Sequence, residues 1–143
     1  MVYLIYLDNV AASFVEDEVL DIFYNTTKKY YANPNSSHKL GREENKMISD
    51  STLRIANMLK VLKDEIIYTS GATESNNLAI KGLCLSYKNY GKHILISSLE
   101  HNSITSSVVS LERLGFEVEV IPVTDKGIVD IESLKSMLRD DTI

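Results

Sequence analysis

From Glu65 onward, strand-like and helix-like patterns alternate along the chain, and this order permits few folds. Strands rich in β-branched and aromatic residues are predicted at residues 65–70, 94–98 and 116–121. A helix pattern follows each of these strands. Alternation of this kind joins parallel strands through helices that pack against the sheet. The sequence therefore predicts an α/β fold of three layers, in which a mainly parallel sheet has helices on both faces.

The helices expected after these strands differ in character. Residues 78–85 form a broad apolar run, which predicts a buried helix. The next helix has an apolar stripe, and Asn102 or Ser103 can cap its N-terminus. The last helix is predicted over about residues 131–138. The β-branched pair at 142–143 reads as the start of another strand, so we expect the chain to be a fragment.

Residues 1–62 have a different pattern and are predicted to form an N-terminal arm and helical segment, separate from a partial α/β domain over 63–143. Residues 2–7 are apolar and aromatic, which suits a short strand or an extended arm. A helix led by acidic residues follows, and its charges suit the helix dipole. Polar residues at 31–37 then predict a loop, and apolar residues repeating every three or four positions predict a long helix over about 39–59.

Composition excludes several classes of function. The 143 residues carry a net charge of −5, which gives no basic surface for nucleic acid or anionic lipid. No apolar run approaches the roughly 20 residues that span a bilayer, so no membrane partner and a cytoplasmic location are expected. Cys84 is the only cysteine and the three histidines are scattered, so neither a disulfide framework nor a metal site is predicted.

Residues 70–75 form a polar turn between a predicted strand and the start of a helix. Gly71 permits a tight turn there, and the free N–H groups of the first helical turn can hold a phosphate with the hydroxyls of Thr73 and Ser75. The segment has neither the P-loop pattern nor the G-x-G-x-x-G pattern. The alternative, which spacing alone leaves open, is that Gly71 only turns the chain and Thr73 only caps the helix.

Glu100-His101 follows the strand predicted at 94–98. The carboxyl ends of neighbouring parallel strands meet at one edge of a sheet, so His101 and the phosphate turn can face one ligand. Its imidazole suits stacking or proton transfer, and the alternative is an ordinary loop histidine. His93 is expected to be an ordinary surface or strand-end residue. Cys84 is expected to belong to the core, and Lys39 to be solvated.

Four motifs follow one another along the chain. They are Tyr6-Leu7-Asp8-Asn9, Asn33-Pro34-x-Ser36-x-His38-x-x-Gly41-Arg42, the block at residues 65–82 that contains Ser70-Gly71-Ala72-Thr73-Glu74-Ser75, and Glu100-His101. Together they resemble the amino-terminal part of cysteine desulfurases. These enzymes belong to the class V aminotransferase group of fold type I pyridoxal-phosphate enzymes. The resemblance implies that residues 63–143 are an incomplete large domain of that fold.

The resemblance also implies an activity and a set of partners. Cysteine desulfurases are homodimers that use pyridoxal phosphate to convert L-cysteine to L-alanine and pass the sulfur as a persulfide to an acceptor, such as an iron–sulfur scaffold protein. Ala72 and Thr73 match the phosphate-binding positions of the family. His101 matches the histidine that stacks on the pyridine ring, and it is the candidate catalytic residue. No metal is implied.

Other residues of the family pattern have no match in this chain. These are the aspartate that pairs with the pyridine nitrogen, the Schiff-base lysine, the sulfur-accepting cysteine and the arginine that binds the substrate carboxylate. Lys39 and Cys84 do not occupy those positions, so we expect the chain alone to be inactive. Two alternatives remain, another fold type I transaminase or lyase and a non-catalytic domain that binds phosphate or docks a partner.

Overall fold

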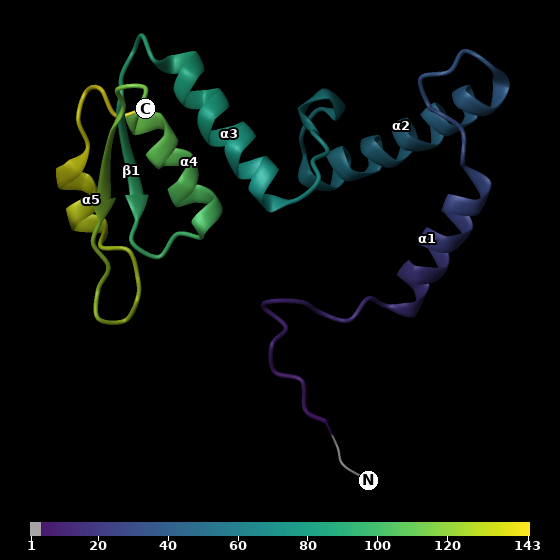
Figure 1. The fold of residues 1–143 in the computed structure, drawn as a ribbon, viewed down its shortest axis with the longest axis horizontal. Helices are drawn as coiled ribbons and strands as arrows, with labels where there is room; N and C mark the ends of the chain where they lie inside the picture. The colour runs from purple at the N-terminus through teal and green to yellow at the C-terminus, as the bar shows by residue number, and fades with distance from the viewer. Residues whose placement is uncertain (1–3) are drawn as a thin grey trace. The chain divides into compact units, whose positions relative to one another are not determined.

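The computed structural model describes residues 4–143 (Figure 1). Its contacts divide the chain into two compact units, Met1–Ile67 and Tyr68–Ile143. The first unit contains α1 (Asp17–Lys29), α2 (Lys39–Leu59) and the short 3₁₀ helix η1 (Lys63–Glu65); the second contains α3 (Ala72–Tyr87), β1 (His93–Ser97), α4 (Asn102–Glu112), β2 (Glu117–Ile121) and α5 (Ile131–Met137). No helix within residues 4–143 combines the length and the apolar character needed to cross a membrane.

Both predicted helices of the first unit form. Acidic side chains lie in the first turn of α1 and lysines in its last turn, which is the arrangement that the helix dipole favours. His38 caps the N-terminus of α2, and its Nδ1 accepts a hydrogen bond from the Gly41 N–H at 3.2 Å. A Cβ at Gly41 would lie 2.5 Å from the Ser36 carbonyl oxygen and 2.7 Å from that of Asn33. The predicted loop therefore packs directly on the first turn of α2.

The strand considered for residues 2–7 is absent from residues 4–7, and Val2 and Tyr3 lie outside the described residues. Residues 4–8 form no regular structure, and a turn follows at residues 9–11. The Tyr6 hydroxyl donates to the carbonyl oxygens of Asp8 and Ala12 at 3.0 and 2.9 Å, and its ring packs edge-on against Phe14.

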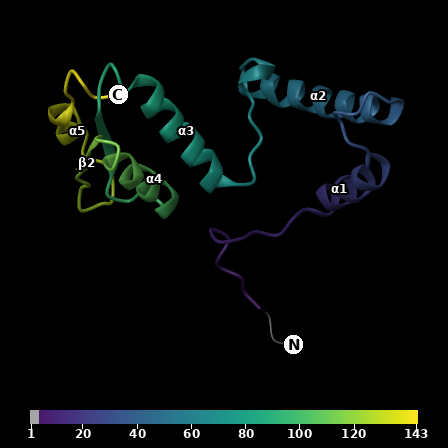
Figure 2. The ribbon, with the colours of Figure 1, turned by 45° about the horizontal axis from the view of Figure 1, so that its top comes forward.

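The two strands of the second unit are parallel, with His93 opposite Glu117 and Ser97 opposite Ile121. The α4 helix makes the crossover between them. They lie between α5 on one face and α4 on the other, with α3 packed against α4 (Figures 1 and 2). The predicted α/β class, with a parallel sheet and helices on both faces, is confirmed.

Residues 141–143 pair with the other edge of β1. His93 and Thr142 form a parallel bridge, the His93 N–H donates to the Asp141 carbonyl at 3.0 Å, and the Ile143 N–H donates to the His93 carbonyl at 3.0 Å. Thr142 thus forms a single parallel bridge to β1, and the strand expected to start at 142–143 stays a prediction. His93 is the first residue of β1, so the expectation of a strand-end position is confirmed. It is not a surface residue, because its side chain is 0% exposed, with Nδ1 2.8 Å from Thr142 Oγ1 and Nε2 3.6 Å from Glu119 Oε2.

A small hydrophobic core holds the second unit together. Leu111 is fully buried and packs with Phe116 and Cys84, and the partly buried Ile80 and Ile94 complete the cluster. These residues come from α3, β1, α4 and the position just before β2. The core therefore fixes α3 and α4 relative to the strands, and with them the first turn of each helix.

Two predictions for residues 65–85 are wrong. No strand forms at residues 65–70, where η1 ends at Glu65 and Ile67 is 68% exposed. An extended segment becomes a strand only when a neighbouring strand takes up its backbone hydrogen bonds, and the sheet formed by the described residues consists of β1 and β2 only. The α3 helix is also not a buried helix, because Cys84 is its only buried residue while Leu78 and Leu83 are exposed.

Candidate functional site

The polar turn at residues 70–75 leads directly into α3. Gly71 is the residue before the helix, and the first backbone hydrogen bond of the helix runs from the Ser75 N–H to the Gly71 carbonyl at 3.1 Å. The N–H groups of Ala72, Thr73 and Glu74 precede that bond, so they remain outside the hydrogen-bond ladder of the helix. A Cβ at Gly71 would meet no atom within 4 Å, so space is open beside these groups.

Hydrogen bonds already engage part of the turn. Glu74 Oε2 accepts from the Ser70 N–H at 2.6 Å and from the Ser70 hydroxyl at 2.7 Å. These two bonds, the backbone one first, hold the pKa of the Glu74 carboxyl below its usual value. The Ser75 hydroxyl lies 2.6 Å from Thr69 Oγ1, although the sequence suggested it for phosphate. The Thr73 hydroxyl makes no hydrogen bond recorded among the described residues, which leaves it available.

His101 caps the N-terminus of α4. Its Nδ1 accepts a hydrogen bond from the Ser103 N–H at 3.1 Å, and its backbone is extended as a capping residue requires. The expectation that Asn102 or Ser103 caps this helix is therefore wrong, because both already lie inside it. Capping propensities favour Asn and Ser over His, so the residue types alone give no signal for this role.

Ser103 joins His101 to the start of α3. The Ser103 hydroxyl oxygen lies 2.9 Å from His101 Nδ1, and it also accepts a hydrogen bond from the Asn76 side-chain amide at 2.8 Å. Asn76 lies within the first two turns of α3, four residues after Ala72. The structure thus brings the phosphate turn and His101 into one neighbourhood, although none of the described hydrogen bonds joins Ala72 or Thr73 directly to His101.

Sequence reasoning missed the roles of Asn76 and Ser103. The sequence does mark Asn76 as a candidate for a polar contact, because it is a polar residue at the beginning of a helix whose later turns are apolar. The partner of its amide could not be identified, since Ser103 lies 27 residues further along the chain.

The other candidates have no place in this site. Burial raises the pKa of the Cys84 thiol, and the side chain packs in the core, so it is not a nucleophile. Lys39 is exposed and lies 3.8 Å from Glu43. Among residues 4–143, no group of three or more His, Cys, Asp and Glu side chains is arranged to hold a metal ion.

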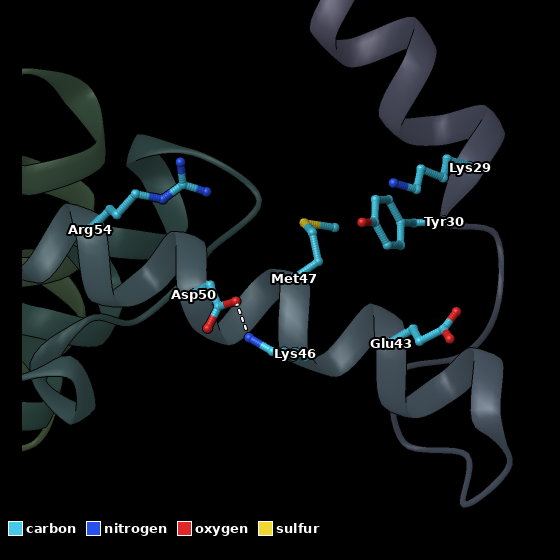
Figure 3. A pocket seen from close by; sticks show the side chains of 7 residues that line it. All are labelled: Lys29, Tyr30, Glu43, Lys46, Met47, Asp50 and Arg54. Atoms are coloured by element: carbon cyan, nitrogen blue, oxygen red, sulfur yellow. Dashed lines mark hydrogen bonds and ion pairs between the residues drawn. The ribbon is translucent and has the colours of Figure 1, made fainter.

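An open pocket of about 440 Å³ lies within the first unit (Figure 3). Its walls come from the end of α1 and from α2, and they are Lys29, Tyr30, Glu43, Lys46, Met47, Asp50 and Arg54. Lys46 and Asp50 form an ion pair at 2.6 Å, and the Lys29 ammonium lies over the Tyr30 ring at 5.0 Å. Lys46–Asp50 is the one ion pair between wall residues of this pocket in the described part of the chain, and none of the candidate site residues lines it.

Comparisons with known proteins match nearly the whole chain. Residues 5–143 match the family model of class V aminotransferases. A protein of Dictyoglomus turgidum named cysteine desulfurase IscS is 42% identical over 139 residues, and one of the same name from Neisseria meningitidis serogroup A is 39% identical over 140 residues. Each alignment covers 97% of this chain and 35% of the relative, so the chain spans about a third of the length of these relatives.

Solved structures share the fold. A NifS-like protein superimposes with a TM-score of 0.88 at 32% identity, over 94% of this chain and 37% of that one. A structure described as SspA in complex with cysteine gives a TM-score of 0.82 at 30% identity, over 93% of this chain and 38% of that one.

Proposed function

This chain belongs to the class V aminotransferase family, and from that membership we propose that it forms the amino-terminal part of a pyridoxal-phosphate-dependent cysteine desulfurase. The enzyme would convert L-cysteine to L-alanine and pass the sulfur as a persulfide to an acceptor, such as an iron–sulfur scaffold protein. The names of the relatives support this activity, and a related structure described in complex with cysteine supports the substrate.

The observation that carries the proposal is the hydrogen-bonded connection between the start of α3 and His101. A cofactor with a phosphate at one end and an aromatic ring at the other needs an anion site and a flat side chain within the same neighbourhood. The Asn76–Ser103 hydrogen bond provides that proximity without any contribution from the first unit of the chain.

The residues at the start of α3 fit the phosphate of the cofactor. Ala72 and Thr73 would bind it through their N–H groups and the Thr73 hydroxyl, since these donors are free and the space beside Gly71 is open. The nearby Glu74 carboxylate is already bonded to two Ser70 donors. His101 would stack on the pyridine ring and hold a proton close to it. When bound, pyridoxal phosphate supplies the electron sink for carbon–sulfur bond cleavage.

The proposal extends to the organisation of the protein. Residues 63–143 would be part of the cofactor-binding domain. Residues 1–62 would form an arm and a helical segment that precede this domain in the sequence. We propose a cytoplasmic homodimer. Large apolar side chains that are exposed in the first unit, among them Val10, Phe14 and Phe23, support a further partner for that part of the chain.

The chain alone would not turn over cysteine. The chemistry requires a lysine that forms a Schiff base, a carboxylate at the pyridine nitrogen and a thiolate that accepts sulfur, and no residue here matches those positions. The purified 143-residue chain, given pyridoxal phosphate and L-cysteine, should release no alanine above the background of the free cofactor.

A protein that combines this chain with the missing residues tests the activity itself. It should release alanine from L-cysteine and form one persulfide for each alanine. Turnover by the 143-residue chain alone would contradict the assignment of the missing residues. Transfer of the amino group of cysteine to a keto acid, without persulfide, would instead favour the transaminase alternative.

A further inference from the structure

We propose that Ser103 and Asn76 are positioning residues that hold the His101 imidazole in one orientation and in one tautomer, with its proton on Nε2. The consequence for the reaction rests on the proposed function, because only a bound cofactor gives the His101 ring something to stack on. The hydrogen-bond arrangement itself belongs to this chain and can be tested without the cofactor.

The first step of the argument is the role of His101 Nδ1. The Ser103 backbone N–H can only donate, and it lies 3.1 Å from Nδ1. A ring nitrogen that accepts a hydrogen bond carries no hydrogen of its own. The neutral imidazole must therefore carry its proton on Nε2.

The second step is a series of two hydrogen bonds, donated from Asn76 to Ser103 and from Ser103 to His101. The Asn76 side-chain amide donates to the Ser103 hydroxyl oxygen at 2.8 Å. Because Nδ1 carries no hydrogen, the Ser103 hydroxyl, whose oxygen lies 2.9 Å from it, must be the donor in this pair. Each bond polarises the next, so the amide of Asn76 strengthens the donor that faces His101.

The third step is that this arrangement is rigid at Ser103. Ser103 is only 6% exposed, and its backbone carbonyl accepts a hydrogen bond from the Ser107 hydroxyl at 2.7 Å. Ser107 is itself fully buried. The hydroxyl that meets His101 is thus fixed by buried structure, whereas the His101 ring is at the exposed end of the network.

His38 shows what a capping histidine has without this second donor. Its Nδ1 accepts from the Gly41 N–H at 3.2 Å, as His101 does from Ser103. No side-chain hydroxyl joins that bond among the hydrogen bonds of the described residues. His38 therefore serves as an internal reference for a histidine that only caps a helix.

The functional consequence concerns the one polar atom left to His101. Nδ1 is engaged by two Ser103 donors, so only the Nε2–H group remains for a ligand or a proton acceptor. A ring held in one orientation meets a stacked partner without the entropy cost of being ordered first. Ser103 and Asn76 would contribute to the reaction in this way without touching cofactor or substrate.

The test is the tautomer of His101, read from the ¹⁵N chemical shifts of the histidine side chains in the 143-residue chain at alkaline pH. A His101→Gln variant assigns the signals. In the unsubstituted chain, His101 should carry its proton on Nε2. Ser103→Ala should raise the share of the Nδ1-protonated form roughly threefold or more, the effect of losing one hydrogen bond.

Two variants distinguish positioning from folding. Ser103→Thr keeps a hydroxyl at the same place and should retain the original tautomer. Thr105→Ala removes a hydroxyl from the same turn of α4, where it donates to the Asn102 carbonyl, and should leave the His101 signals unchanged. Should Ser103→Ala unfold the chain, as judged by its amide spectrum, Asn76→Ala provides the same test at the other end of this series of hydrogen bonds, where the residue is only partly buried.

Two results would overturn the inference. One is a proton on Nδ1 of His101 in the unsubstituted chain. The other is an unchanged tautomer in a folded Ser103→Ala or Asn76→Ala chain. Failure of the proposed function would be seen separately, as a complete enzyme that neither binds pyridoxal phosphate nor releases alanine, and it would leave the tautomer measurement intact.

Discussion

At the scale of single residues, two neighbours at the start of α3 differ in what their polar atoms do. Glu74 is satisfied by Ser70, whereas the Thr73 hydroxyl makes no hydrogen bond recorded among the described residues. A side chain that is already bonded contributes to the stability of the turn, and one that is free can bind a ligand. The two residues therefore call for different tests.

Thr73→Ala should weaken the binding of pyridoxal phosphate to the complete enzyme about tenfold or more, because a hydrogen bond to a charged oxygen contributes roughly 1.5–3 kcal/mol. An absorbance titration of the cofactor measures this. Thr105→Ala is the matched control, and its affinity should equal that of the unsubstituted enzyme. Equal affinities for both variants would remove Thr73 from the phosphate site.

Glu74→Gln should change how the stability of the chain depends on pH. The pKa of Glu74 is lower in the folded chain than in the unfolded one, so its ionised form stabilises the fold above the unfolded pKa, and this stability is lost as pH falls through the folded pKa. The variant should therefore be less stable than the unsubstituted chain at neutral pH, and the difference should narrow in acid.

Urea midpoints at neutral and acidic pH measure that difference. Ser70→Ala removes one of the two donors to the Glu74 carboxylate and should reduce the same pH dependence while leaving the charge in place. A difference between Glu74→Gln and the unsubstituted chain that stays constant as the pH falls would refute the role of this carboxylate.

At the scale of elements, local patterns predicted what depends on local contacts. The α2 helix spans the predicted 39–59, because an apolar stripe and a loop of turn residues define a helix within its own sequence. The strand predicted at 65–70 does not form. Its β-branched residues favour the extended conformation, but the strand that would pair with it must come from elsewhere in the chain. Local sequence could not predict the contact in the site for the same reason. Asn76 and Ser103 come together only because α3 packs on α4.

Gly91→Ala should break the pairing of residues 141–143 with β1. An added Cβ would overlap the Asp141 carbonyl oxygen and crowd Ile143. We expect a loss of stability of about 1–3 kcal/mol, the usual cost of overpacking a tight contact. Urea unfolding measures the loss, and amide exchange at His93 and Ile143 should accelerate.

Gly82→Ala is the matched control for Gly91→Ala. Gly82 lies inside α3, and an added Cβ there would meet no atom within 4 Å. Alanine is the better helix former, so this variant should gain about 0.5–1 kcal/mol. An equal loss of stability in both variants would contradict the steric explanation.

At the scale of the whole molecule, stability is concentrated in few buried side chains. Leu111→Ala should destabilise the second unit by about 2–5 kcal/mol, because a fully buried leucine leaves a cavity when it is truncated. That is a large part of the roughly 5–15 kcal/mol that stabilises an ordinary domain. Urea unfolding of the 143-residue chain measures the change.

Val109→Ala tests whether the loss comes from burial. Val109 lies on the same helix but is 49% exposed, so its truncation should cost well under half as much as that of Leu111. Comparable losses at the two positions would mean that helix α4, and not the core, determines the stability of this unit.

The two-sided pairing of β1 also sets an order for folding during protein synthesis. His93 is bonded to Thr142, which follows 49 residues later. At roughly 5–20 residues per second, a ribosome completes β1 about two to ten seconds before that partner exists. Throughout this interval the imidazole of His93 stays in water and one edge of β1 is unpaired. Burial of His93 by residues 141–143 therefore follows the synthesis of both β1 and β2.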